Sequence, residues 1–345
     1  MRSTNTKMLP SEIGSRETGT LRSGMRRVVV TGAHRKVAIE LINLLMASSL
    51  VERVLAVSEG ACPPPLLGLD STRFSFATAN LSRRREVDNL FLLDASIDTP
   101  FDTVVHLAFS GNPRGYNFQR HNFNVNATRY LVEASLRHSI DKVVFLSSDA
   151  VYKVGARVDY KVREDAELNL DPDVHSTVRD IIDAEFICRA KMDHPRCDVM
   201  VLRPAGVLGG GVMSGLNLLC ESHPPLLPVG FDPMINPTTK ERLAHDLLLS
   251  IMLRGKGVYN VAGVSAGPLS ALLRARGIEP RRVPGLMLRS ANRLQRFLGQ
   301  TRYHAEFHPR RLYFSLVLDD ARFAGLFRAN AEALDEPTPE KGSSV

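Results

Sequence analysis

The stretch Arg27-Val-Val-Val-Thr-Gly-Ala-His-Arg-Lys-Val-Ala38 decides the fold of this chain. Its β-branched run predicts a strand at 27–31, and the apolar residues that follow predict a helix at 36–47. A strand that runs through a short turn into a helix is the first unit of a parallel α/β sheet. In such sheets this first turn is where a dinucleotide phosphate binds.

Strand-like and helix-like segments continue to alternate beyond this unit. Further strands are predicted at 53–57, 73–76, 102–107, 142–146 and 199–203, and helices at 83–93, 118–138 and 174–191. Short apolar runs separated by helices indicate a parallel sheet that is covered on both faces. Right-handed crossovers then give an α/β fold, a Rossmann-like doubly wound parallel sheet.

The chain divides into segments of different character. We expect a disordered N-terminal extension at 1–24 and a Rossmann-like dinucleotide-binding domain at 25–203, whose sheet is completed by 240–262. A smaller substrate-binding domain is expected from 204–239 and 263–335, where Gly and Pro mark loops and the last part is helix-rich and basic. Residues 336–345 are expected to form a tail.

Composition narrows the class of protein. The 345 residues carry 44 Lys and Arg against 37 Asp and Glu, a net charge of +7, which suits an anionic ligand. The chain lacks a spanning apolar run, a signal-peptide core and any CxxC spacing among its four cysteines, so we expect a cytoplasmic protein with reduced thiols. Helix-turn-helix, zinc-finger and RNA-sheet motifs are absent, so nucleic acid is not an expected partner.

Five further motifs follow the first turn in a characteristic order. They are Val104-Val-His-Leu-Ala108, Asn124-Val-Asn-Ala-Thr128, Val144-Phe-Leu-Ser-Ser-Asp-Ala-Val-Tyr152, Val201-Leu-Arg-Pro-Ala-Gly-Val-Leu-Gly209 and Gly257-Val-Tyr-Asn-Val-Ala-Gly263. Their order and spacing resemble the extended short-chain dehydrogenase/reductase family, the NAD-dependent epimerase/dehydratases, over roughly residues 26–330. The resemblance implies a domain that binds NAD(H) or NADP(H). It also implies catalysis by a Ser or Thr hydroxyl and the Tyr and Lys of a Tyr-x-x-x-Lys motif.

The resemblance assigns the cofactor-binding positions to residues at or just after the ends of the strands and, for Asn124, to the helix predicted at 118–138. They are Thr31, Gly32, Arg35, Lys36, Glu59, Asn80, Leu81, Leu107, Ala108, Asn124 and Pro204. Glu59 follows Ser58, which stands where an acid is usual, and it either accepts from a ribose hydroxyl or is a surface residue. Asn80, in place of an acid after the third strand, can hydrogen-bond an adenine without charge.

The glycine loop departs from the family pattern Thr-Gly-x-x-Gly-x-x-Gly. Arg35 and Ala38 stand at the second and third glycine positions, and a side chain at the second should collide with the pyrophosphate of a dinucleotide. His34, Arg35 and Lys36 are either a cationic lip at a helix N-terminus that binds an anion, or solvated charges left after the glycines were lost. We favour the second interpretation.

The catalytic positions depart as well. Ser148 matches the hydroxyl that orients the substrate, and Asp149 stands where some sugar dehydratases carry an acid. The segment Val174-His-Ser-Thr-Val-Arg179 places His175 at the Tyr position and Arg179 at the Lys position, four residues apart on one helix face. This pair is a general base beside a fixed charge, an anion site, or a site that has lost its role.

Two functional hypotheses follow. The leading one is a divergent family member with lost or rebuilt catalysis, a pseudoenzyme, that binds a nucleotide-like or anionic ligand or a protein partner. The alternative is an active NAD(P)-dependent oxidoreductase or epimerase that uses Ser148, His175 and Arg179. NAD or NADP is the candidate cofactor, although the altered loop makes its binding doubtful. Apolar residues of the expected cleft favour a hydrophobic ligand: Met213, Leu216, Phe231 and Met234.

Three further features give weaker indications of a metal site, a lipid contact and a dimer. His304 and His308 lie at helical spacing, which hints at zinc, but two surface histidines are the favoured interpretation and no metal is expected. The segment 284–299 alternates Leu and Phe with Arg289, Arg293 and Arg296, so it is either a helix that touches anionic lipid or, as we favour, a domain helix with a solvated basic face. The resemblance implies a homodimer through the helices at 118–138 and 174–191.

Overall fold

The computed structural model describes residues 22–92, 100–110, 118–156, 159–172, 174–263, 265–303 and 310–327. His304, His308, the predicted tail at 336–345 and most of the predicted extension at 1–24 lie outside these residues. None of the helices within them combines the length and the apolarity that a membrane crossing needs.

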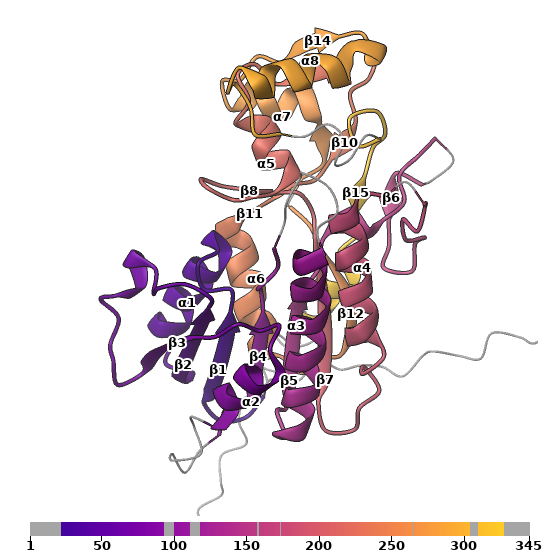
Figure 1. The fold of residues 1–345 in the computed structure, drawn as a ribbon. Helices are drawn as coiled ribbons and strands as arrows, with labels where there is room; N and C mark the ends of the chain where they lie inside the picture. Colours follow the sequence, from indigo (N-terminus) through magenta and orange to yellow (C-terminus); the bar gives the residue numbers. More distant parts are fainter. Residues whose placement is uncertain are drawn as a thin grey trace, which may run out of the picture.

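A parallel sheet forms the centre of the molecule (Figure 1). In order across the sheet its strands are β12 Gly257–Val261, β7 Asp198–Pro204, β5 Lys142–Leu146, β4 Thr103–His106, β1 Arg26–Thr31, β2 Val51–Ser58 and β3 Phe74–Thr78. The order reverses direction between β1 and β4, which makes the crevice at their carboxyl ends the topological switch point of the sheet. The predicted α/β, Rossmann-like doubly wound fold is confirmed.

Helices cover both faces of the sheet. One face carries α1 Lys36–Ala47 and α6 Lys240–Met252, and the other carries α2 Arg84–Leu92, α3 Phe118–Arg137 and α4 Ser176–Arg189. Val28 and Val30 of β1 point into the first core and Val29 into the second, and all three are fully buried. This is why β1 is a continuous apolar run, since a strand covered on both sides has no polar face.

A smaller lobe stands over the carboxyl edge of the sheet (Figure 1). It contains helices α5 Gly215–Cys220, α7 Leu269–Ala275 and α8 Gly285–Phe297. Short strands pair in and beside it: β8 Val207–Leu208 with β11 Thr238–Thr239, β9 Leu226–Pro228 with β14 Arg281–Val283, β10 Met234–Ile235 with β13 Gly267–Pro268, and β6 Lys161–Val162 with β15 Val317–Leu318. Its own apolar core includes Leu219, Leu227, Leu273 and Leu288.

A buried polar network ties the edge strand to the body of the sheet. The guanidinium of Arg203 on β7 makes a two-point ion pair with Glu185 of α4 and donates to the hydroxyl of Tyr152 at 2.9 Å. That hydroxyl donates in turn to Oδ1 of Asn260 on β12, at 2.6 Å. Burial raises the pKa of Tyr152 to about 12, so the phenol keeps its proton and is a structural donor.

Arg22, which belongs to the predicted extension, packs against the lower end of the sheet. Its guanidinium donates to Thr103 Oγ1 at 2.6 Å and to Asp102 Oδ1 at 3.1 Å, and the side chain is almost fully buried. These charge-assisted bonds hold the backbone that leads into β1.

Candidate ligand-binding site

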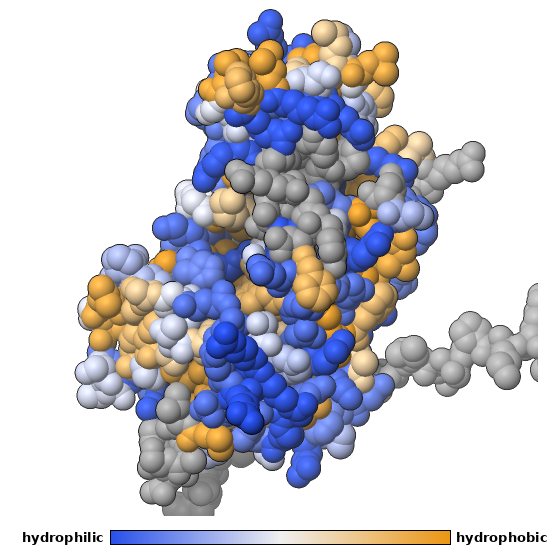
Figure 2. All heavy atoms as spheres, viewed as in Figure 1, coloured by the Kyte–Doolittle hydropathy of each residue, from blue (hydrophilic) through white to orange (hydrophobic). Residues whose placement is uncertain are grey.

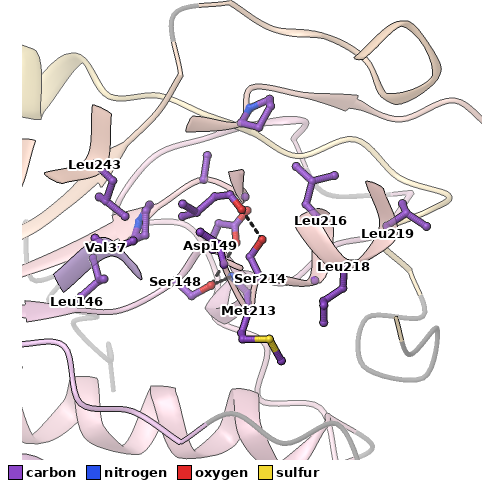
Figure 3. A pocket seen from close by; sticks show the side chains of 18 of the residues that line it. Val37, Leu146, Ser148, Asp149, Met213, Ser214, Leu216, Leu218, Leu219 and Leu243 are labelled. Atoms are coloured by element: carbon purple, nitrogen blue, oxygen red, sulfur yellow. Dashed lines mark hydrogen bonds between the residues drawn. The ribbon is translucent and has the colours of Figure 1, made fainter. Parts of the chain in front are cut away.

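A cavity of about 500 Å³ lies between the carboxyl edge of the sheet and the lobe (Figure 3). The loops after β1, β4, β5 and β7 form its floor, and α4, α5 and the lobe form its walls. Of the predicted site residues, it is lined by Arg35, Lys36, Leu107, Ser148, Asp149 and Pro204. A crevice of this kind at the switch point is where open α/β sheets bind ligands.

The larger part of the cavity is apolar. Its walls carry Val37, Leu146, Met213, Leu216, Leu218, Leu219 and Leu243 (Figure 3). Met213 and Leu216 thus lie where the sequence predicts an apolar cleft. Phe231 and Met234 do not line the cavity, although the neighbouring Ile235 does.

Arg35 bridges two loops at the switch point. It is the N-cap residue of α1, and its Nη1 donates to the carbonyl oxygen of Leu107, just beyond β4, at 2.9 Å. No carboxylate among the described residues pairs with this guanidinium, and burial lowers the pKa of Arg35. The side chain therefore crosses the space between the loops after β1 and β4, and it brings a charge without an anionic partner to the cavity.

His34 extends to the opposite side of the same loop. Its Nδ1 is hydrogen-bonded to Oγ of Ser58, at the end of β2, at 3.0 Å. Burial and the nearby Arg35 charge lower the pKa of His34, which favours a neutral imidazole. Consecutive side chains of the loop thus contact the ends of both strands that flank β1.

The predicted adenosine side does not belong to this cavity. Glu59 is exposed, and the Asn80 side chain accepts from the main-chain N of Ser82 at 2.9 Å, a local turn that precedes α2. Leu81 is buried in the core beneath that turn. Asn80 and Leu81 thus make local contacts, and their assignment to cofactor binding stays a prediction.

Thr31, Gly32 and Ala108 hold the loops after β1 and β4 together. Gly32 has φ +74°, and a Cβ there would lie 2.7 Å from the main-chain N of Ala108, so only glycine fits. Thr31 Oγ1 is hydrogen-bonded to Nδ1 of His106 at 2.8 Å. Burial lowers the pKa of His106 to about 3, so this imidazole is neutral. The first glycine of the family pattern is therefore required here by packing.

Asn124 positions the loop after β4 from outside the cavity. Its Oδ1 accepts from the main-chain N of Ser110 at 2.8 Å, and its Nδ2 donates to Oδ2 of Asp180 at 3.0 Å. Ser110 lines the cavity, whereas Asn124 does not. Asn124 thus acts on the site through the loop.

Ser148 and Asp149 form the polar part of the floor (Figure 3). Ser148 caps the short helix η2 Asp149–Val151, accepting from the main-chain N of Ala150 at 3.1 Å, and donates to Asp149 Oδ1 at 3.2 Å. The other oxygen of Asp149 is ion-paired with Nη1 of Arg311 at 2.9 Å. The carboxylate is thereby paired with a cation from far along the chain.

His175 and Arg179 lie away from the cavity. His175 is the N-cap residue of α4, and its Nδ1 accepts from the main-chain N of Thr177 at 3.3 Å. Arg179 is exposed and donates to the carbonyl of Pro172 at 3.1 Å. The α4 residues that do line the cavity are Thr177 and Ile181, one turn apart.

The phase of α4 follows from its packing. Val178 and Ile182 are buried in the core beneath the cavity, and Glu185 is held by Arg203. Residues three to four apart share one helix face, so these anchors turn Thr177 and Ile181 toward the cavity. The pair predicted from the sequence, His175 and Arg179, therefore lies two residues before the pair that faces the cavity. Thr177, Ile181 and Arg311 also line the cavity, and none of them belongs to a motif that predicts a site.

Comparison with known proteins shows what this architecture resembles. The sequence profile of the NAD dependent epimerase/dehydratase family matches residues 28–211. The uncharacterized protein y4nG of Sinorhizobium fredii (strain NBRC 101917 / NGR234) is 26% identical over 206 residues, 56% of this chain and 51% of that protein. The chain thus spans about half the length of the curated relative it matches.

Solved structures share the fold over most of the chain. WbmH of Bordetella bronchiseptica in complex with NAD+ is 17% identical, with TM-score 0.63, over 86% of this chain and 90% of that one. A UDP-N-acetylglucosamine 4-epimerase of Methanobrevibacter ruminantium is 15% identical, with TM-score 0.66, over 88% and 92%. A UDP-glucuronic acid 4-epimerase of Bacillus cereus with NAD is 17% identical, with TM-score 0.63, over 88% and 91%.

Proposed function

The chain belongs to the NAD-dependent epimerase/dehydratase family, and we propose that it is a ligand-binding member without the hydride-transfer chemistry typical of that family. The observation that carries the proposal is the face of α4, which presents Thr177 and Ile181 to the cavity. Neither side chain can exchange a proton near neutral pH, so this face of α4 supplies no general base, a group that is worth about 10²–10⁴-fold in rate.

Two side chains support the proposal that a dinucleotide does not bind in the arrangement that the family resemblance implies. Arg35 spans the switch-point crevice to Leu107, and His34 covers the end of β2 at Ser58. The space that a pyrophosphate would need is crossed by one of these side chains. The usual hydride transfer through NAD is therefore not part of the proposed function.

The chemistry of the cavity favours a ligand with an anionic group and an apolar body. Arg35 supplies a partly buried guanidinium whose hydrogen-bond acceptor is a neutral carbonyl, and Lys36 lies beside it. A ligand carboxylate or phosphate at this helix N-terminus would form charge-assisted hydrogen bonds. The leucines of α5 and of the rest of the lobe would contact the apolar body of the ligand.

The competing function is an active NAD(P)-dependent oxidoreductase or epimerase that uses Ser148, His175 and Arg179. It would require the helix that carries His175 and Arg179 to rotate, because Thr177 and Ile181 line the cavity in their place. Titration of the full chain with NADH and NADPH, followed by nicotinamide fluorescence and calorimetry, separates the two functions. We expect no saturation below millimolar cofactor, and micromolar binding would reject the proposed function.

The ligand class is tested with octyl phosphate and octanol, which share an apolar chain and differ in charge. We expect octyl phosphate to bind more tightly, and Arg35→Met to weaken its binding at least tenfold while leaving octanol unchanged. Equal effects of Arg35→Met on both compounds would show that Arg35 does not recognise the anion. Octyl phosphate binding that Leu219→Asn leaves unchanged would place the ligand outside the cavity.

A further inference from the structure

Helix α8 exposes apolar side chains along one face. Leu286 is 100% exposed and Phe297 is 87% exposed. Together with three neighbours they form what we call the outer face of α8: Leu286, Met287, Leu294, Phe297 and Leu298. Soluble proteins rarely expose this many large apolar side chains in one place without a partner surface.

The opposite side of α8 is firmly packed on the lobe. Leu288 is buried in the lobe core, Asn292 is buried beside it, and Gln295 donates to the carbonyl of Pro224 at 2.8 Å. At about 100° per residue, the outer face covers an arc of roughly 120° that points away from these anchors. The outer face is therefore a fixed feature of the folded lobe and does not arise from a loosely held helix.

The position of α8 leaves its outer face accessible to a flat surface. The helix lies at the end of the lobe farthest from the central sheet (Figure 1). Apolar and strongly hydrophilic residues gather side by side at that end of the molecule (Figure 2). A planar partner could contact α8 before it met the sheet or its covering helices.

Positive charge is concentrated around the same helix. Residues 265–303 contain eight arginines and one acidic residue, Glu279. Arg289, Arg293 and Arg296 follow one another along a third arc of α8, between the outer face and the buried face. Arg281 on the adjacent strand β14 is also exposed. The exposed apolar face is thus bordered by guanidinium groups.

We propose that α8 docks this protein on an anionic lipid surface. The outer face would enter the headgroup region, and the exposed Arg281 and Arg289 beside it would bind lipid phosphates, which is how basic amphipathic helices lie in an interface. A second copy joined through the same face would place the arginine-rich borders of both copies together, at a cost from like-charge repulsion. The charge therefore favours anionic lipid over self-association.

Flotation with lipid vesicles tests this docking on the full chain. We expect the protein to float with vesicles of 70% phosphatidylcholine and 30% phosphatidylserine, to float poorly with pure phosphatidylcholine, and to be released by 0.5 M salt. The double variant Leu286→Ser/Phe297→Ser should weaken binding to the anionic vesicles at least tenfold. Arg289→Glu should weaken it several-fold and reduce its salt dependence.

A matched control distinguishes docking through α8 from non-specific adsorption to vesicles and from misfolding of the variants. Leu67 and Leu170 are exposed leucines far from α8 in sequence, so Leu67→Ser/Leu170→Ser removes exposed apolar surface elsewhere and should leave vesicle binding unchanged. All variants are checked for wild-type circular dichroism and melting temperature. Equal binding to neutral and anionic vesicles, or no binding at all, would overturn the proposal. A wild-type dimer in sedimentation velocity that becomes a monomer in the α8 double variant would also overturn it, in favour of a second copy.

Discussion

The guanidinium of Arg35 and the carbonyl oxygen of Leu107 are joined by a 2.9 Å hydrogen bond that bridges the ends of two adjacent parallel strands. One side chain at a position that is glycine in the family pattern thus extends across the crevice where open α/β sheets bind ligands. Substitutions of Arg35 can separate the steric effect of this side chain on ligand binding from its electrostatic effect.

Arg35→Gly is expected to open the crevice. Glycine removes the side chain, remains a competent N-cap residue and lets main-chain N–H groups face a phosphate. We expect NADH affinity to rise at least tenfold over wild type, measured by nicotinamide fluorescence. Arg35→Met is the control, because it removes the charge and keeps a side chain in the crevice. An equal gain in both variants would contradict the steric explanation.

The ion pair between Glu185 and Arg203 is expected to be essential for stability. Both side chains are at most 1% exposed, so Glu185→Gln leaves a buried guanidinium without its counter-charge. Loss of one partner of such a pair costs about 3–5 kcal/mol of unfolding free energy. Urea denaturation followed by circular dichroism measures the loss. Glu167→Gln, in the exposed pair with Lys153, should change stability by less than about 1 kcal/mol.

Gly263 is expected to tolerate no side chain. A Cβ there would lie 1.8 Å from the carbonyl oxygen of Pro237, which is a backbone atom that cannot rotate away. Gly263→Ala should therefore destabilise the protein by more than about 2 kcal/mol through forced backbone movement. Gly267→Ala, where a Cβ meets nothing within 4 Å, should be close to neutral in the same thermal melts. Similar melting temperatures for the two variants would refute the predicted clash.

Lys142 is expected to give stability a pH dependence above neutrality. The side chain is fully buried, its Nζ donates to the carbonyl of Leu253, and burial lowers its pKa from 10.5 to about 7. Between these values the unfolded chain holds a proton that the folded chain has released, so stability rises with pH across this window. Below pH 7 both states are protonated, and the cost of the buried charge is constant.

The difference in unfolding free energy between wild type and Lys142→Met isolates this effect. The unfolding free energy of wild type minus that of Lys142→Met should increase by up to about 1.4 kcal/mol for each pH unit between pH 7.5 and 9.5. Lys191→Met, at an exposed position, should show a flat difference over the same range. A flat difference for Lys142→Met as well would mean that the buried amine keeps its ordinary pKa.

Elements with strong periodicity could be predicted closely from the sequence. The helix expected at 36–47 is α1 Lys36–Ala47, and the strand expected at 142–146 is β5 Lys142–Leu146, because continuous apolar runs and a regular apolar stripe fix both. The strand expected at 73–76 is instead β3 Phe74–Thr78, at the edge of the sheet, where a single neighbour constrains the register less.

The site could be predicted only in part. Arg35, Lys36, Ser148 and Asp149 follow strands, and the sheet itself brings them together at its carboxyl edge. The face of α4 could not be read from spacing alone, since His175 and Arg179 have the same separation as Thr177 and Ile181. The packing of Val178 and Ile182 in the core decides which of the two pairs faces the cavity. The positions of the apolar residues along the helix are the sequence feature that indicates this packing. Arg311 binds Asp149 across a separation of 162 residues, and a local sequence motif cannot predict such a contact.

The bond from Tyr152 to Asn260 has a practical consequence for dissecting the gene. An expression fragment cut at residue 211, where the family profile stops, would lack β12 and α6. Tyr152 would lose its acceptor, and the apolar residues of α1 that pack on α6 would face solvent. A fragment that keeps these contacts has to extend to at least Val261, so it also contains the lobe segment 204–239, which lies between β7 and α6 in the sequence.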